Sequence, residues 1–302
     1  MGAGAVGCFF GGMLARAGVP VTLIGRRDRV EAITRDGLFI DGVHFQEKVT
    51  VAASTQPDAA LDADLILFCV KTLDTEESAR LLQPHVKPGA IVVSLQNGVD
   101  NVERIRNATR TASGNGGIEA LPAVVYVAAA MKAAGRVKHS GRGDLVIGHD
   151  SRRTEVEHVA QTFERAGVPC RIAENIEGEL WVKLIMNCAG NAVTALGRSS
   201  YGRAAQHEPA RRVMRATAEE AIAVARAAGV KLPPADFVAA GIELAKNLGP
   251  ATSSTAQDIQ RGKRTEIDSL NGLIARRGAE LGVPTPVNHT LYSLIKLLEE
   301  NL

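Results

Sequence analysis

Three glycines at the start of the sequence constrain its fold more than any other feature. Gly2, Gly4 and Gly7 have the spacing GxGxxG, and residues 5–17 after them are expected to form a helix. The next run, Val19–Gly25, is rich in β-branched residues, as a strand that follows such a helix should be. Glycines at these places permit a tight turn and a close approach of the backbone to a pyrophosphate at the helix N-terminus. The pattern therefore predicts a Rossmann-like dinucleotide-binding domain.

A unit of this kind normally begins with a strand that leads into the glycine turn. About five residues are needed for that strand, and it is central in the sheet. Only Met1 precedes Gly2 in this sequence. We therefore expect a Rossmann-like domain whose first strand is missing.

The residues after the second predicted strand indicate which dinucleotide is bound. A domain that prefers NAD carries an acidic residue there for the ribose 2′-hydroxyl, whereas this chain has Arg26 and Arg27. A guanidinium suits a 2′-phosphate, so NADP(H) is the expected cofactor. Asp28 is expected to cap a helix that begins near Arg29. The predicted cofactor contacts in this region are Gly2, Gly4, Ala5, Val6, Gly7 and Arg26.

Two continuous apolar runs follow, at residues 64–70 and 90–95, and each is typical of a buried parallel strand. Ligands of open α/β sheets bind beyond the carboxyl ends of the strands, where Lys71 and Asn97 stand. Each also has a plainer interpretation: Lys71 as a surface lysine beside a helix, and Asn97 as a residue of an Asn-Gly turn. Their equivalent positions in adjacent units favour contacts with cofactor or substrate.

The pattern changes from mixed to almost entirely helical at Glu174. We therefore predict two domains, a dinucleotide-binding domain over residues 1–173 and a helical domain over residues 174–302. In the first domain, residues 136–140 and 144–148 are expected to form a pair of strands joined through Gly141 and Gly143. Further helices are expected near residues 155–166, 207–228, 234–247, 268–281 and 286–299.

An unusual helix is predicted over residues 177–195. It places Lys183, Asn187 and Asn191 at i, i+4 and i+8, along one narrow face. An ammonium and two amides cost free energy when buried without partners, so this face is expected to bind a ligand. The opposite face is expected to point into the core, with Val182, Ile185, Ala189, Val193 and Leu196.

A segment dense in polar groups, residues 253–268, precedes the last two helices. Ser254 suits the cap of a short helix, and Thr265 with Asp268 suits a capping box. On spacing alone, capping is a better interpretation of this segment than catalysis.

Composition restricts the remaining possibilities. The chain has 302 residues, enough for two domains, and 35 basic against 33 acidic residues, which gives no reason to expect a nucleic-acid partner. Its four cysteines form no CxxC pair, so neither a metal site nor a disulfide framework is expected. No apolar run is long enough for a membrane span, and no signal peptide is recognised. A cytoplasmic protein with reduced thiols is expected.

The chain as a whole resembles the ketopantoate reductase (2-dehydropantoate 2-reductase) family. The resemblance extends over essentially the whole chain, and the blocks in the second half are more specific than the glycine motif. The matching segments are GAGAVG (2–7), Arg26, CVK (69–71), QNGV (96–99), WVKLIMNCAGNAVTA (181–195), SSTAQD (253–258) and KRTEIDSLNG (263–272).

The resemblance implies NADPH-dependent reduction of ketopantoate to (R)-pantoate, a step of pantothenate and coenzyme A biosynthesis. It implies that Lys183 is the general acid and that Glu266 orients this lysine and the substrate hydroxyl. It also implies that Ser254 binds the substrate rather than capping a helix. The implied substrate contacts are Asn97, Asn187, Asn191 and Ser254, and the implied further cofactor contacts are Lys71, Asn97 and Glu266.

Two alternatives remain open from the sequence. One is an NADPH-dependent reductase of another 2-oxo acid, and the other is a non-catalytic NADP(H)-binding sensor. A homodimer is compatible with either.

Overall fold

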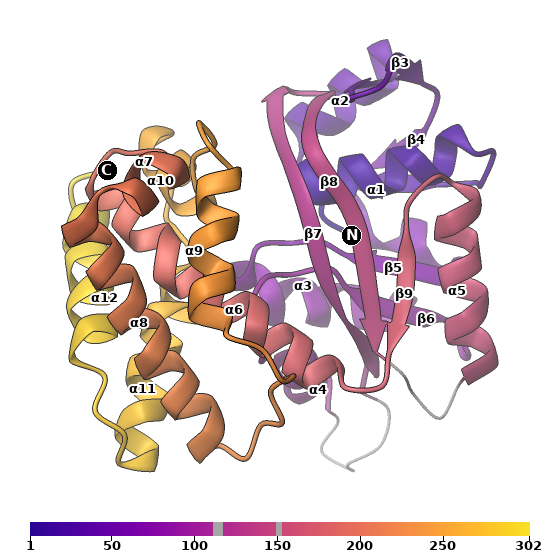
Figure 1. Cartoon of the computed structure of the whole chain (residues 1–302). Helices are drawn as coiled ribbons and strands as arrows, with labels where there is room; N and C mark the ends of the chain where they lie inside the picture. Colours follow the sequence, from indigo (N-terminus) through magenta and orange to yellow (C-terminus); the bar gives the residue numbers. More distant parts are fainter. Residues whose placement is uncertain (111–116, 149–152) are drawn as a thin grey trace. The chain divides into compact units, whose positions relative to one another are not determined.

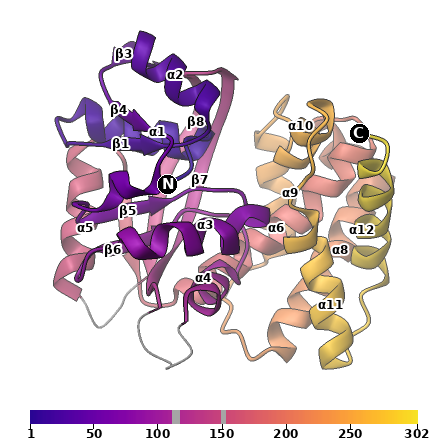
Figure 2. The same cartoon turned by 180° about the vertical axis from the view of Figure 1, so that it is seen from behind.

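The structure is a computed structural model that describes residues 1–110, 117–148 and 153–302. The chain forms two compact units, Met1–Ile176 and Glu177–Leu302. Figures 1 and 2 show their secondary structure from opposite sides. Each unit is described by itself below.

The first unit is a mixed sheet with flanking helices, which confirms the predicted α/β class. Its strands are β1 (Thr22–Ile24), β2 (Leu38–Asp41), β3 (Gln46–Val49), β4 (Ala52–Ser54), β5 (Leu65–Phe68), β6 (Ile91–Ser94), β7 (Ala120–Ala133), β8 (Arg136–Gly148) and β9 (Cys170–Ala173). Its α-helices are α1 (Ala5–Arg16), α2 (Arg27–Asp36), α3 (Thr75–Leu82), α4 (Asn101–Thr109) and α5 (Arg153–Arg165).

The strands of the described residues form two sheets. The larger has the order β3-β2-β8-β7-β6-β5, with β9 on the same edge of β8 as β2, and the smaller is the parallel pair β1-β4. Strands β5, β6 and β7 run parallel to one another, whereas β7 and β8 form a long antiparallel hairpin (Figure 1). The carboxyl ends of β5 and β6 therefore lie at the same edge of the sheet.

Residues Met1–Ala3 connect the two sheets, although they are too short to count as a strand. The terminal ammonium of Met1 donates to the Leu67 carbonyl at 2.8 Å, and the Cys69 N–H donates to the Met1 carbonyl at 2.8 Å. On the other side, the N–H groups of the next two residues both donate to the Ile24 carbonyl at 2.9 Å. Met1–Ala3 thus lie between β1 and β5, where the predicted missing strand would pair.

The sheet is covered by helices on both faces, as the continuous apolar runs predict. Leu65 and Leu67 of β5 pack into a core that contains Phe10 of α1 and Phe163 of α5. The alternate residues Ile66 and Phe68 belong to a second core with residues of α3 and α4. This double coverage confirms the prediction of buried parallel strands.

The predicted strand pair joined through Gly141 and Gly143 is wrong, because both glycines lie inside the single strand β8. The chain instead reverses before β8, where Gly135 has φ +70°. The β7–β8 register shifts near Val127 and Ala128, so the glycines belong to a bulged region rather than a turn. A side chain at position 143 would lie 3.0 Å from the ring of Phe9.

The second unit is helical. Its helices are α6 (Ile176–Leu196, which begins one residue before the unit), α7 (Tyr201–Gln206), α8 (Glu208–Ala227), α9 (Phe237–Asn247), α10 (Ser254–Gln260), α11 (Asn271–Leu281) and α12 (Pro286–Glu299). No helix in the described part of the chain is long and apolar enough to cross a membrane.

The predicted helix around Lys183 is confirmed as α6, and Ile185, Ala189, Val193 and Leu196 of its predicted core stripe are buried or pack against apolar clusters, although other residues of the helix are buried more deeply. Of that stripe only Ile185 is fully buried, whereas Val182, Ala189, Val193 and Leu196 are half-buried. The residues that are buried instead include Trp181, Leu184, Cys188, Ala192 and Ala195. Helix α6 contributes residues to two separate apolar clusters, so it packs against neighbours on several sides rather than along one stripe.

Candidate active site

The glycine turn of the first unit is a tight backbone structure that other residues would disrupt. Gly2 has φ +98°, and a Cβ there would lie 2.7 Å from backbone atoms of Cys69 and Val70. A Cβ on Gly7 would collide with the carbonyl oxygen of Gly2. The turn is closed by a hydrogen bond of 2.7 Å from the Gly4 N–H to the Gly2 carbonyl. Backbone packing therefore requires glycine at positions 2 and 7.

This turn leads into α1 in a way that suits an anionic ligand. The first N–H groups of a helix have no partners within the helix. No side chain caps α1, and its first turn contains no acidic residue. The N-terminal N–H groups at Ala5 and Val6, together with the helix dipole, fit the pyrophosphate of a dinucleotide.

Arg26 lies just after β1, as the sequence predicts, with its side chain 77% exposed and 3.9 Å from the carboxylate of Asp74. The predicted cap at Asp28 is wrong, because α2 begins at Arg27 and Arg26 is its N-cap residue. Asp28 instead lies in the first turn of α2, where a carboxylate interacts favourably with the helix dipole.

Arg29 is a residue of this region that the sequence analysis did not single out. Its guanidinium donates to the Ala3 carbonyl at 2.7 Å, beside Gly4. Arg29 thus ties α2 to the glycine turn and adds positive charge near it. Its position as the fourth residue of an RRDR run did not distinguish it from Arg26 or Arg27.

Lys71 and Asn97 follow β5 and β6, and the structure brings their segments together. The hydroxyl of Thr72, next to Lys71, donates to the Asn97 carbonyl at 3.1 Å. Asn101 of α4 donates to the same carbonyl at 2.7 Å. The two predicted positions therefore belong to one edge of the sheet.

Gln96, the first residue of the QNGV segment, joins the ends of the two strands by hydrogen bonds. Its amide nitrogen donates to the Val70 carbonyl at 3.1 Å and to the Thr75 hydroxyl at 2.8 Å. Its amide oxygen accepts a hydrogen bond of 3.0 Å from Ser94. Gln96 is 5% exposed, so these bonds satisfy a buried amide between the two strand ends.

In the second unit, Lys183, Asn187 and Asn191 follow one another along α6. Lys183 and Asn187 are half-buried, and Asn191 is 2% exposed. The amide oxygen of Asn191 accepts a hydrogen bond of 2.6 Å from the Tyr201 hydroxyl, and its amide nitrogen donates to Ser254 at 3.4 Å. The sequence-predicted partners Asn191 and Ser254 are thus in contact.

Tyr201 is a functional candidate that no sequence pattern indicated. It is the first residue of α7, and its ring lies against α6, where a Cβ on Gly190 would approach it to 2.8 Å. Burial raises the pKa of the Tyr201 hydroxyl well above its usual range, so this group stays protonated and can donate to Asn191.

The cap of α10 is Ser253 rather than Ser254. The Ser253 hydroxyl accepts from the Ala256 N–H at 3.1 Å and donates to the Asn191 carbonyl at 3.2 Å. Thr194 also donates to Ser253, at 2.8 Å. Because Ser253 performs the capping, the Ser254 side chain is left to face Asn191, which corrects the capping interpretation of Ser254.

Glu266 lies between α10 and α11, on a segment that is fixed to the last helix. The N–H and the hydroxyl of Thr265 both donate to the Glu299 carboxylate, at 2.6 Å each. The predicted capping box is wrong, because Asp268 instead accepts hydrogen bonds from Tyr292 and Lys296 of α12. Ile267, next to Glu266, belongs to the apolar cluster that contains Ala192 and Ala195 of α6. The Glu266 segment therefore packs against α6.

Known proteins resemble this chain over its whole length. The family model described as ketopantoate reductase PanE/ApbA matches residues 1–152, and the model of its C-terminal part matches residues 175–299. The 2-dehydropantoate 2-reductase of Archaeoglobus fulgidus is 34% identical, over 100% of this chain and 97% of that protein. That of Pyrococcus horikoshii is 33% identical, over 99% and 96%.

A solved structure gives the same result. The crystal structure of a PanE/ApbA family ketopantoate reductase from Ralstonia eutropha JMP134 is 48% identical, with a TM-score of 0.92, and covers 100% of this chain and 97% of that one. With two family models in sequence order and full-length relatives above 30% identity, the chain belongs to the ketopantoate reductase family.

Proposed function

We propose that this protein reduces 2-dehydropantoate (ketopantoate) to (R)-pantoate with NADPH, in pantothenate and coenzyme A biosynthesis. The observation that supports this most is the row of Lys183, Asn187 and Asn191 on α6, with Ser254 bonded to its end. One ammonium and several neutral donors suit a substrate that carries a carboxylate and becomes an alkoxide during reduction. The names of the full-length relatives support the same substrate.

In this proposal Lys183 is the general acid. NADPH supplies the hydride that reduces the C2 carbonyl. The Lys183 ammonium stabilises the negative charge that develops on the carbonyl oxygen and transfers a proton to it. Glu266 orients Lys183 and the substrate hydroxyl and contacts the cofactor.

The substrate contacts are Asn187, Asn191, Ser254 and Asn97. The three from the second unit are fixed by α6 and the start of α10, and Tyr201 holds the Asn191 amide in one orientation. In the first unit, the proposed cofactor contacts are Gly2, Gly4, Ala5, Val6, Gly7, Arg26, Lys71 and Asn97. Residues 1–173 are thus the proposed NADP-binding domain and residues 174–302 the proposed substrate-binding and catalytic domain.

The test is the rate of NADPH oxidation by the purified protein with ketopantoate, 2-oxopantoyl lactone and 2-oxoisovalerate. We expect the largest kcat/KM with ketopantoate and a faster reaction with NADPH than with NADH. A larger kcat/KM with another 2-oxo acid would identify a different reductase. NADPH binding, measured by fluorescence titration, without turnover of any 2-oxo acid would indicate a sensor.

Arg26→Ala tests the cofactor preference. A charge-assisted hydrogen bond contributes about 1.5–3 kcal/mol, so we expect the Kd of NADPH to rise about tenfold or more, with the Kd of NADH unchanged. Arg35→Ala is a matched control, because Arg35 has a similarly exposed side chain (72%) but pairs with Asp36 on α2. Equal losses for NADPH and NADH would argue against a phosphate contact by Arg26.

Tyr201→Phe tests the support of Asn191. The variant keeps the buried ring and removes one hydrogen bond, of 2.6 Å, to the amide oxygen. A hydrogen bond contributes about 0.5–1.5 kcal/mol net, so we expect KM for the 2-oxo acid to rise about two- to tenfold, with kcat and NADPH affinity nearly unchanged. Tyr126→Phe, in the first unit, controls for the loss of a tyrosine hydroxyl. A fall in kcat with unchanged KM would contradict a role in substrate binding.

A cytoplasmic location and a homodimer are also proposed. All four cysteines are free thiols, and burial raises the pKa of Cys69 to about 11, which suits a reducing compartment. Leu294 and Leu297 of α12 are 45% and 57% exposed and offer apolar surface to a second copy. Light scattering measures the mass in solution.

A further inference from the structure

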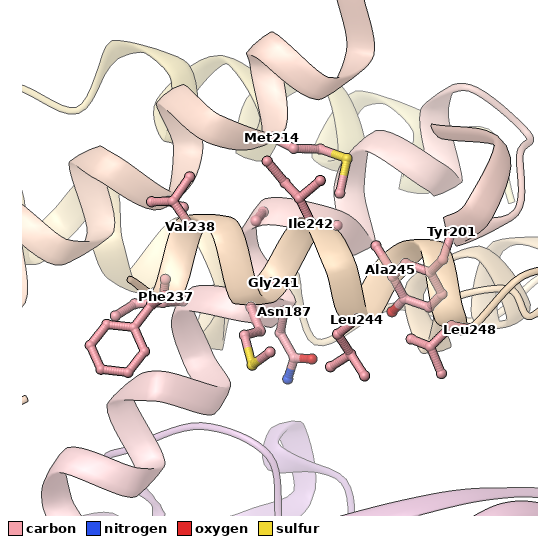
Figure 3. A pocket seen from close by; sticks show the side chains of 15 residues that line it. Asn187, Tyr201, Met214, Phe237, Val238, Gly241, Ile242, Leu244, Ala245 and Leu248 are labelled. Carbon is pink, nitrogen blue, oxygen red and sulfur yellow. The ribbon is translucent and has the colours of Figure 1, made fainter. Parts of the chain in front are cut away.

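An apolar cavity of about 80 Å³ lies within the helical unit, among α6, α7, α8 and α9. Its walls include Met186 and Asn187 of α6, Met214 of α8, and Phe237, Ile242 and Leu244 of α9. Figure 3 shows Val238 and Ile242 on the side of α9 that faces Met214, and Phe237 and Leu244 on the side of Asn187. The lining residues in the described part of the chain all belong to the helical unit.

The lining predicts what the cavity holds. Asn187 and Tyr201 are the only lining residues with polar side chains, and the Tyr201 hydroxyl is engaged by Asn191. The volume is several times the ~10–15 Å³ that one water molecule needs, but a water here would find too few polar partners. Cavities of this composition bind apolar groups.

The cavity adjoins the polar row proposed to hold the substrate. Asn187 belongs to both, and it follows Lys183 by one turn of α6, a rise of about 6 Å. A 2-oxo acid whose carbonyl lies at Lys183 therefore has its substituent on C2 within reach of the cavity. On the basis of the proposed function, we propose that this cavity holds the apolar substituent of the 2-oxo acid and that Gly241 determines how large a substituent it accepts.

Gly241 keeps the cavity open. It lies on the same face of α9 as Phe237, Leu244 and Leu248, which are four residues before it and three and seven after it. A Cβ at position 241 would have as its nearest atom the Met186 Cγ at 3.9 Å, which is an ordinary contact. A larger side chain at this position would project into the cavity from a helix that tolerates it, since glycine is a weak helix former.

The experiment measures kcat/KM with pyruvate, 2-oxobutyrate, 2-oxoisovalerate and ketopantoate for the wild type, Gly241→Ala and Gly241→Leu. In the wild type we expect kcat/KM to rise along this series. In Gly241→Leu we expect a loss of about 10-fold or more with the two branched acids, within the range for hydrophobic pockets, and less than threefold with pyruvate. Gly241→Ala should give an intermediate loss. Ala240→Leu, on the exposed face of α9, is the matched control and should leave all four values unchanged.

The outcomes separate this proposal from the proposed function. Equal losses with all four acids in a folded Gly241→Leu would overturn the cavity assignment and leave the reductase proposal intact, whereas a flat series in an active wild type would overturn both the cavity assignment and the preference for ketopantoate. Absence of turnover with every acid would overturn the reductase proposal. In that case calorimetry still tests the cavity: tighter binding of 2-oxoisovalerate than of pyruvate, lost in Gly241→Leu, supports it, and equal binding overturns it. Circular dichroism and the Tm establish that each variant is folded.

Discussion

Lys183→Ala is expected to lower kcat by about 10²–10⁴-fold, the range associated with a positioned general acid. The alanine keeps α6 helical, because alanine is the best helix former, and leaves Asn187 and Asn191 in place. NADPH should bind with unchanged affinity, since the proposed pyrophosphate and 2′-phosphate contacts belong to the first unit. Steady-state kinetics with ketopantoate measures the first effect, and fluorescence titration with NADPH measures the second.

Lys246→Ala is a suitable control for the loss of a lysine, because Lys246 lies at the exposed end of α9 and forms an ion pair with Glu243 of the same helix. It should retain wild-type kcat. Turnover by Lys183→Ala within a few-fold of wild type would remove this residue from the chemistry. A loss confined to KM would place it in substrate binding instead.

Gly7→Ala is expected to weaken NADPH binding by more than tenfold and to lower the Tm. The new Cβ would collide with the Gly2 carbonyl oxygen, so either the turn or the start of α1 must move. Overpacking of this kind typically costs about 1–3 kcal/mol in folding free energy. The displaced N–H groups can then no longer approach the pyrophosphate closely.

Gly4→Ala separates the two effects. A Cβ on Gly4 has only the Arg29 guanidinium nearby, at 3.7 Å, and Gly4 has φ −84°, which any residue adopts. This variant should therefore keep the wild-type Tm and lose NADPH affinity only if the cofactor occupies the space in front of Gly4. Unchanged affinity in both variants would argue against pyrophosphate binding at this turn.

The parts of the fold that the sequence predicted are those with a strong local pattern. The strands β5 and β6 are recognisable because each is a short, continuous apolar run. The long helix α6 is recognisable because its side chains follow the helical period. Strands β2 to β4 were not predicted. They are three or four residues long, and three of the four residues of β3 are exposed, so their pairing depends on neighbours rather than on their own composition.

The site shows the same division. Lys183, Asn187 and Asn191 could be aligned from helical spacing alone, whereas Tyr201 reaches Asn191 through tertiary packing. Helix α7 is held against the end of α9 because Gly202 approaches the backbone of Gly249 so closely that a Cβ would lie 2.8 Å from its oxygen. No periodicity in the sequence encodes such a contact. The choice of Ser253 over Ser254 as the cap is likewise a matter of one residue of register.

The contacts around Asn191 also determine which hydrogen-bonding group the site offers to a ligand. The Asn191 amide presents its oxygen to the Tyr201 hydroxyl and its NH₂ to Ser254. Ser254 accepts a hydrogen bond on that side, and its own O–H can be directed at a ligand. A carboxylate or keto oxygen suits that donor, so the row of side chains that begins at a buried tyrosine ends in a group matched to the oxygens of an acid.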